Sequence, residues 1–77
     1  MNKLRRKALE SLSEEIQLLR SQLEELRDDE QEAFDNLPES LQSSDRGQQM
    51  EDAIGSMEIA MDSLDEAEES ISDAINA

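Results

Sequence analysis

Carboxylates are the only side chains in this sequence whose number and spacing could support chemistry. The chain has 21 aspartates and glutamates against 7 lysines and arginines, and its formal net charge at pH 7 is −14. Histidine, cysteine, tyrosine and tryptophan are absent, so the usual neutral-pH base, thiol nucleophile and soft-metal ligands are missing. The serines therefore have no base to activate them, and the two glycines cannot build a phosphate-binding loop. We expect no enzymatic activity, no catalytic residue and no cofactor.

One run of acids has the spacing of a calcium-binding loop. The matching residues are Asp28, Glu30, Glu32, Asn36 and Glu39. However, Ala33 stands where the sharp turn of such a loop needs glycine, and a helical pattern of apolar residues continues through this stretch. The run is typical of a solvated helix face, and we expect no metal site.

The acids are distributed unevenly along the chain. Residues 1–27 carry a net charge of +1, whereas residues 28–77 carry −15 and contain a single base, Arg46. Such a surface repels nucleic acid and anionic membranes and favours a protein partner with a basic surface. The candidate partner-binding residues are Asp28, Asp29, Glu32, Asp35, Glu58, Asp62, Asp65, Glu66, Glu69 and Asp73.

An uncompensated row of acids can imitate nucleic acid. Spread over a helix about 52 Å long, the net negative charge averages one unit per roughly 3.5 Å. This spacing is near the 3.4 Å that separates phosphates along one DNA strand. The alternative is that the acids only keep a small apolar bundle soluble.

A basic cluster, Lys3, Arg5, Arg6 and Lys7, opens the chain. If the chain folds back on itself, these side chains lie beside residues 70–77 and offset the negative end of the second helix. The alternative use is binding of a small anion.

Apolar residues recur with a seven-residue period in two segments. In the first, Leu9 and Leu12, Ile16 and Leu19, and Leu23 and Leu26 form one stripe, which Glu30, Ala33 and Leu37 continue. In the second the stripe is Met50, Ile54, Met57, Met61, Leu64, Glu68, Ile71 and Ile75. Ala53, Ala60, Ala67 and Ala74 recur beside it. These small residues would let two helices approach closely; the alternative is that they are present only because alanine favours helix. The period is that of a coiled coil.

The period fails around Pro38, which cannot continue a helix because it lacks an amide proton. The sequence predicts one all-α domain with a helix at about 2–36, a hinge at about 37–44 and a second helix at about 45–76. Pro38 to Gln42 could form one helical turn, and Ser43, Ser44 or Asp45 could cap the second helix. A connection this short favours an antiparallel helical hairpin resembling a coiled coil.

A single seam between two helices leaves little margin of stability. Several apolar residues lie off the predicted stripes and are candidates for a second contact surface: Leu4, Leu18, Phe34, Leu41 and Ile59. We therefore expect a homo-oligomer, in the simplest case a dimer of hairpins forming a four-helix bundle. No apolar run is long enough for a membrane span or signal peptide, so we expect a cytoplasmic protein with no membrane partner.

The hinge residues are similar to those of a known group of proteins. The run Asn36-Leu37-Pro38-Glu39-Ser40-Leu41-Gln42, between a Glu-rich stretch and an alanine-heptad helix, resembles small acidic proteins encoded by phages and mobile elements of Gram-positive bacteria. The resemblance implies an accessory protein that binds and inhibits a host protein, such as a defence nuclease, in the bacterial cytoplasm. The alternatives from the residues are a coiled-coil scaffold and a small-anion sponge that uses the basic cluster.

Overall fold

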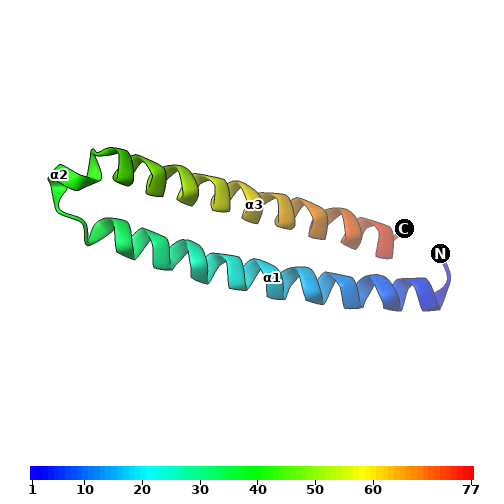
Figure 1. Ribbon diagram of the computed structural model, residues 1–77. Helices are drawn as coiled ribbons and strands as arrows, with labels where there is room; N and C mark the ends of the chain where they lie inside the picture. Colours follow the sequence, from blue (N-terminus) through cyan, green and yellow to red (C-terminus); the bar gives the residue numbers. More distant parts are fainter.

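The computed structural model describes residues 1–77 and consists of helices with no strand. Helix α1 spans Lys3–Asp35, the short α2 spans Glu39–Gln42, and α3 spans Asp45–Ile75. The two long helices run antiparallel, so that both termini lie at the end of the rod opposite α2 (Figure 1). The rod measures 58 × 15 × 12 Å. The expectation of an all-α, elongated chain is confirmed.

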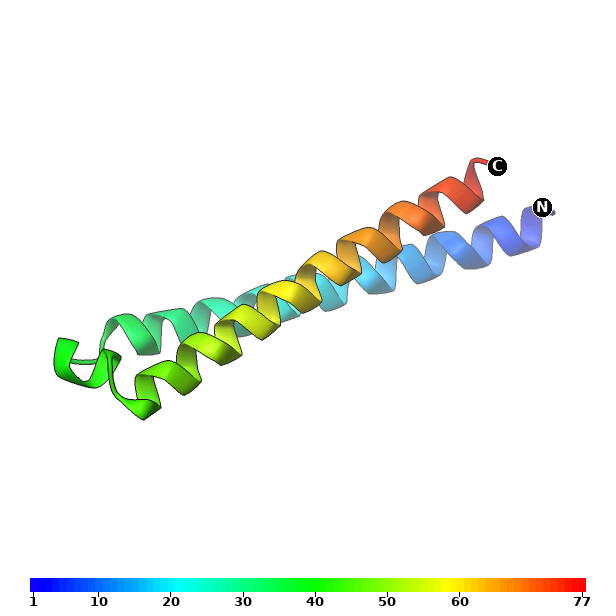
Figure 2. The ribbon, with the colours of Figure 1, turned by 90° about the horizontal axis from the view of Figure 1, so that it is seen from above.

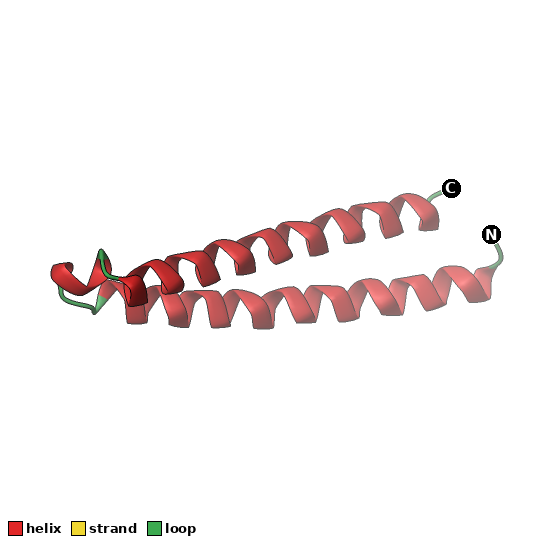
Figure 3. Cartoon of the chain, turned by 45° about the horizontal axis from the view of Figure 1, so that its top comes forward, coloured by secondary structure: helices red, strands yellow, loops and turns green.

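The two long helices lie side by side in Figure 1 and cross each other at a shallow angle when seen from above (Figure 2). This crossing is typical of helices that keep one stripe in contact along their length. Loops occur only at the hinge and at the two termini (Figure 3).

The helix boundaries follow from local caps. The Asn2 side chain accepts a hydrogen bond from the backbone N–H of Arg5 at 2.9 Å and caps α1. Helix α1 ends at Asp35, three residues before Pro38. Of the three candidate caps for α3, Ser44 has the role, since its hydroxyl accepts from the N–H of Gly47 at 3.4 Å.

Gln42 ties the hinge to the end of α1. Its side-chain Nε2 donates to the carbonyl oxygens of Phe34 and Leu37, each at 3.2 Å. Phe34 is in the last turn of α1, and Leu37 lies in the connection that follows it. The hinge is therefore an ordered connection in which α2 leads the chain directly into α3.

The predicted stripe on α3 is in the seam, meaning the line of contact between α1 and α3. Ile54 and Met61 are buried, and Met50, Met57, Leu64, Ile71 and Ile75 are half-buried. These are the positions that the seven-residue period selects, so this part of the sequence reading is confirmed.

The predicted stripe on α1 is only half right. Leu9, Ile16 and Leu23 are half-buried in the seam, but Leu12, Leu19 and Leu26 are 48%, 54% and 59% exposed. Their places are taken by the residues that follow them in the chain, Ser13, Arg20 and Arg27, all half-buried. Consecutive residues are 100° apart around a helix, so α1 is rotated toward its polar side relative to the prediction.

The same rotation corrects two further expectations. Phe34, which we expected outside the seam, continues the column of Ser13, Arg20 and Arg27 and is half-buried. The alanines were expected beside the seam, but Ala60 and Ala67 are exposed and only Ala53 and Ala74 are half-buried. Two of the four therefore lie outside the contact between α1 and α3.

Gly47 is where α2 and α3 approach most closely. It is buried, and a Cβ atom at this position would lie 2.0 Å from the backbone oxygen of Gln42 and 2.6 Å from that of Leu41. Only a residue without a side chain fits. Gly55, in the middle of α3, has nothing within 4 Å of a Cβ atom.

We expect the two glycines to respond in opposite directions to alanine. Gly47→Ala should lower the free energy of unfolding by about 1–3 kcal/mol, because backbone atoms must move apart. Gly55→Ala should raise it by about 0.5–1 kcal/mol, because alanine favours helix and meets no obstacle. Urea unfolding at one fixed protein concentration measures both. Equal effects of the two substitutions would contradict the close approach at Gly47.

Candidate interaction surfaces

Two arginines of α1 cross the seam to acids of α3. The Nε of Arg20 lies 2.6 Å from a carboxylate oxygen of Asp65, and NH1 of Arg27 lies 3.5 Å from one of Glu58. Each arginine also pairs with an acid of its own helix, Glu24 or Asp28. One shallow hollow on this side is lined by Arg20, Glu24, Arg27, Glu58, Met61 and Asp62. These residues define the polar side of the rod.

Glu68 takes part in a smaller network on the same side. Its Oε1 accepts hydrogen bonds from the Ser13 hydroxyl at 2.5 Å and from Gln17 Nε2 at 2.9 Å. The sequence placed Glu68 on the apolar stripe of α3. Its carboxylate is accommodated there because the facing residues of α1 are polar.

These contacts shift two pKa values. The hydrogen bond to Asp65 is the main cause that raises the pKa of Arg20 above its ordinary value. The hydrogen bonds from Ser13 and Gln17 lower the pKa of Glu68 below the ordinary glutamate value, because they stabilise the charged carboxylate. Both groups are therefore charged at neutral pH.

The predicted acidic surface divides into paired and free groups. All ten acids are exposed, but Asp28, Glu58 and Asp65 are ion-paired with arginines. Four acids of α3 form no ion pair and follow one another at steps of four and three residues along one side of the helix: Asp62, Glu66, Glu69 and Asp73. We call these four residues the acidic stripe.

The basic cluster lies at the end of the rod where the termini meet. All four of its side chains are exposed. NH2 of Arg6 donates to the backbone oxygen of Ala77 at 3.3 Å, as the antiparallel fold predicts, but no base of the cluster forms an ion pair with an acid of α3. Lys3, Arg6 and Lys7 share a shallow hollow with Glu10, whose carboxylate would oppose a bound anion.

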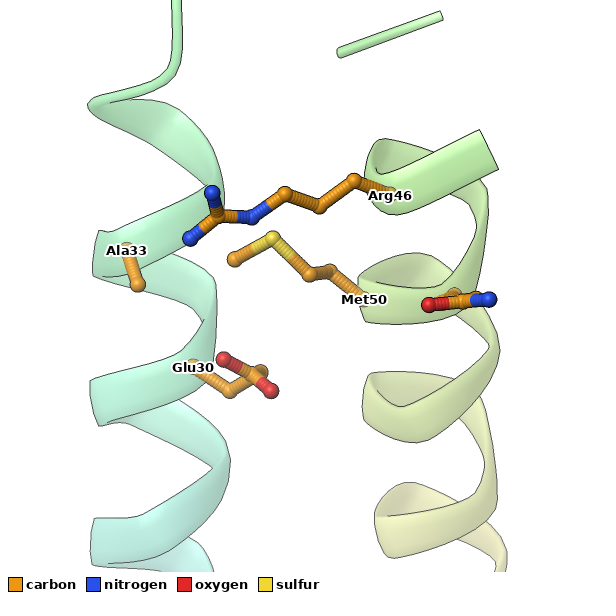
Figure 4. A pocket seen from close by; sticks show the side chains of 5 residues that line it. Glu30, Ala33, Arg46 and Met50 are labelled. Atoms are coloured by element: carbon orange, nitrogen blue, oxygen red, sulfur yellow. The ribbon is translucent and has the colours of Figure 1, made fainter. Parts of the chain in front are cut away.

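The leucine and alanine columns lie on the other side of the rod. A hollow at its hinge end is lined by Glu30 and Ala33 of α1 and by Arg46, Gln49 and Met50 of α3 (Figure 4). Ala33 lies seven residues after Leu26, and Arg46 lies seven before Ala53. The leucine column of α1 and the alanine column of α3 therefore run along this one side. The leucine–alanine face consists of Leu12, Leu19, Leu26, Ala53, Ala60, Ala67 and Ala74.

A single hairpin leaves several large apolar side chains exposed that could be buried in the seam. Full burial of one leucine stabilises a fold by about 1.5–3 kcal/mol, whereas an exposed ion pair contributes only a fraction of that. The hairpin nevertheless places two arginines and a serine in the seam and leaves three leucines outside. The leucine–alanine face is thus a candidate interaction surface.

No three acidic side chains lie close enough together to hold a metal ion. Of the residues with the spacing of a calcium loop, Asp28, Glu30 and Glu32 are part of α1, Asn36 is its C-cap and Glu39 begins α2. No helix has a stretch that is both long and apolar enough to cross a bilayer.

The residues that sequence reasoning missed have a signal in hindsight. Ser13, Arg20, Arg27 and Phe34 are separated by seven residues each, as regularly as the leucines beside them. The acids Glu58 and Asp65 share that spacing on α3. A search for complementary charge at heptad spacing would have paired the two columns.

The lowered pKa of Glu68 has a consequence for stability. Its folded value is below its unfolded value, so the Ser13 contact stabilises the fold fully above about pH 4.3 and loses this effect as pH falls through the lowered pKa. Ser13→Ala should therefore cost most stability at about pH 7 and progressively less toward about pH 3. Urea unfolding across this range measures the difference, with Ser21→Ala on the exposed side of α1 as control. A difference independent of pH would contradict the assignment.

Comparison of the chain with family models, with curated proteins and with solved structures finds no match to any of them. Its function has to be inferred from the acidic stripe, the basic cluster and the leucine–alanine face.

Proposed function

We propose that this protein is a non-enzymatic, homodimeric binding module that occupies a basic surface of a partner protein through its acidic stripe. The observation that supports this most directly is the state of Asp62, Glu66, Glu69 and Asp73, which are exposed, unpaired and aligned on one helix side. Residues 47–77 contain no base that could neutralise them. Repulsion among them is relieved when a basic surface binds.

The charge density favours a partner that otherwise binds nucleic acid. With −14 over a 58 Å rod, the protein carries one net charge per about 4 Å, close to the 3.4 Å phosphate spacing of a single DNA strand. A groove lined with lysine and arginine would accept such a rod. In this proposal the protein is an accessory protein of a phage or mobile element, acts in the bacterial cytoplasm and inhibits a host protein by nucleic-acid mimicry.

A coiled-coil scaffold is the second candidate. The exposed leucine–alanine face favours it, because a scaffold joins partners through apolar helix faces rather than through charge. The two candidates differ in their response to salt, since attraction between exposed charges is screened and apolar contact is not.

Neutralising the acidic stripe tests the first proposal. The variant Asp62→Asn, Glu66→Gln, Glu69→Gln, Asp73→Asn should reduce capture of partners from a Gram-positive bacterial lysate at least about tenfold. It should also raise the melting temperature, because repelling neighbours are removed from α3. Salt should release the captured partners from the unmodified protein, and duplex DNA should displace them if the protein is a mimic.

The matched control removes the same charge elsewhere. Neutralising Glu10, Glu14, Glu15 and Glu25, four exposed and unpaired acids of α1, leaves the same net charge with the stripe intact. This control should retain capture. Equal loss in both variants would show that only net charge matters, and salt-insensitive capture would favour the scaffold.

A further inference from the structure

The core of one hairpin is small for a chain of this length. Ile54 and Met61 are the only buried apolar side chains, whereas eight large apolar residues are exposed. A short chain that buries so little usually gains stability from disulfides, metals or oligomerisation. With no cysteine and no metal cluster, the association of chains is the remaining source.

The exposed apolar residues are not spread at random. Three of them, Leu12, Leu19 and Leu26, form one column of the leucine–alanine face. Arg20 contacts Asp65 and Arg27 contacts Glu58, so the preceding residues Leu19 and Leu26 lie near the level of Ala67 and Ala60. Each level of the face thus offers one large and one small side chain.

A ridge of leucines beside a groove of alanines is complementary to a copy of itself. A twofold axis along the rod would seat the leucine column of one hairpin over the alanine column of the other, and large against small residues pack without voids. The twofold symmetry that most homodimers use requires one surface patch that fits itself.

Charge also favours a second copy over an unrelated chain. A partner carrying −14 of its own can approach only where this molecule carries little charge. Between Ala53 and Ala74, the α3 residues that flank the alanine column on the outer side are Ser56, Ser63 and Ser70, all uncharged. On α1 the matching outer positions, three residues after each leucine, are Glu15, Gln22 and Asp29. In the twofold arrangement these positions lie against the serine column of the other copy, so few like charges meet here.

We infer that the leucine–alanine face is the interface through which a second copy of this chain completes a four-helix bundle. This inference rests on the homodimer of the proposed function and names its contact surface.

Adjacent leucines provide a matched pair of variants. Leu18 and Leu19 are both exposed, at 61% and 54%, but only Leu19 belongs to the face. Light scattering at tens of micromolar should give the mass of two chains for the unmodified protein. Leu19→Gln combined with Leu26→Gln should shift the mass toward one chain, whereas Leu18→Gln combined with Ile59→Gln should not.

Thiol labelling keeps the test decisive if the first pair of substitutions unfolds the chain. Because the sequence has no cysteine, Leu19→Cys and Leu18→Cys each introduce a single thiol. Labelling of the first by a maleimide should slow several-fold as protein concentration rises, and labelling of the second should not. A dimer in which both thiols label equally would overturn the inferred interface and leave the homodimer standing. A monomer at every concentration would overturn both, while salt-dependent capture through the acidic stripe is judged separately.

Discussion

Arg20 and Arg27 each reach from α1 to an acid of α3, and the side of α1 that carries them faces the seam. Exposed ion pairs contribute little stability, so these pairs match the rotation of α1 without outweighing the burial of three leucines. With α1 in this rotation, Ser13 meets Glu68 and the leucine column lies outside. The polar side, the acidic stripe and the leucine–alanine face all take their positions from this rotation.

The rotation gives one thin rod several chemically different sides. On the polar side, Glu58 and Asp65 are ion-paired with arginines of α1. The acids of the acidic stripe form no ion pair and lie on the outer side of α3. The leucine–alanine face lies on the side opposite the polar contacts, as the two hollows show. Because the stripe and the face do not overlap, a dimer would present two acidic stripes to solvent, and two linked sites bind an extended basic surface more tightly than one.

The hinge converts a sequence of heptads into this arrangement. Pro38 ends the first helical run, Gln42 donates to the carbonyls of Phe34 and Leu37, and Gly47 lets α2 lie against the start of α3. The basic cluster is thereby brought beside the C-terminal end of α3. Arg6 donates there to the backbone oxygen of Ala77, while the four bases of the cluster form no ion pair with the acids of α3.

The sequence alone determined the helices, the break at Pro38, the seam of α3 and the exposure of the acids, because these depend on local periodicity and on the cost of burying charge. It did not determine the rotation of α1. Two columns, Leu12-Leu19-Leu26 and Ser13-Arg20-Arg27, have the same seven-residue period, and only the second meets complementary groups on α3. Likewise nothing in the sequence around Gly47 indicates that glycine is required there. A side chain is excluded at this position only because the backbone of α2 packs against it. The tertiary structure decided these points because each depends on what another helix places opposite.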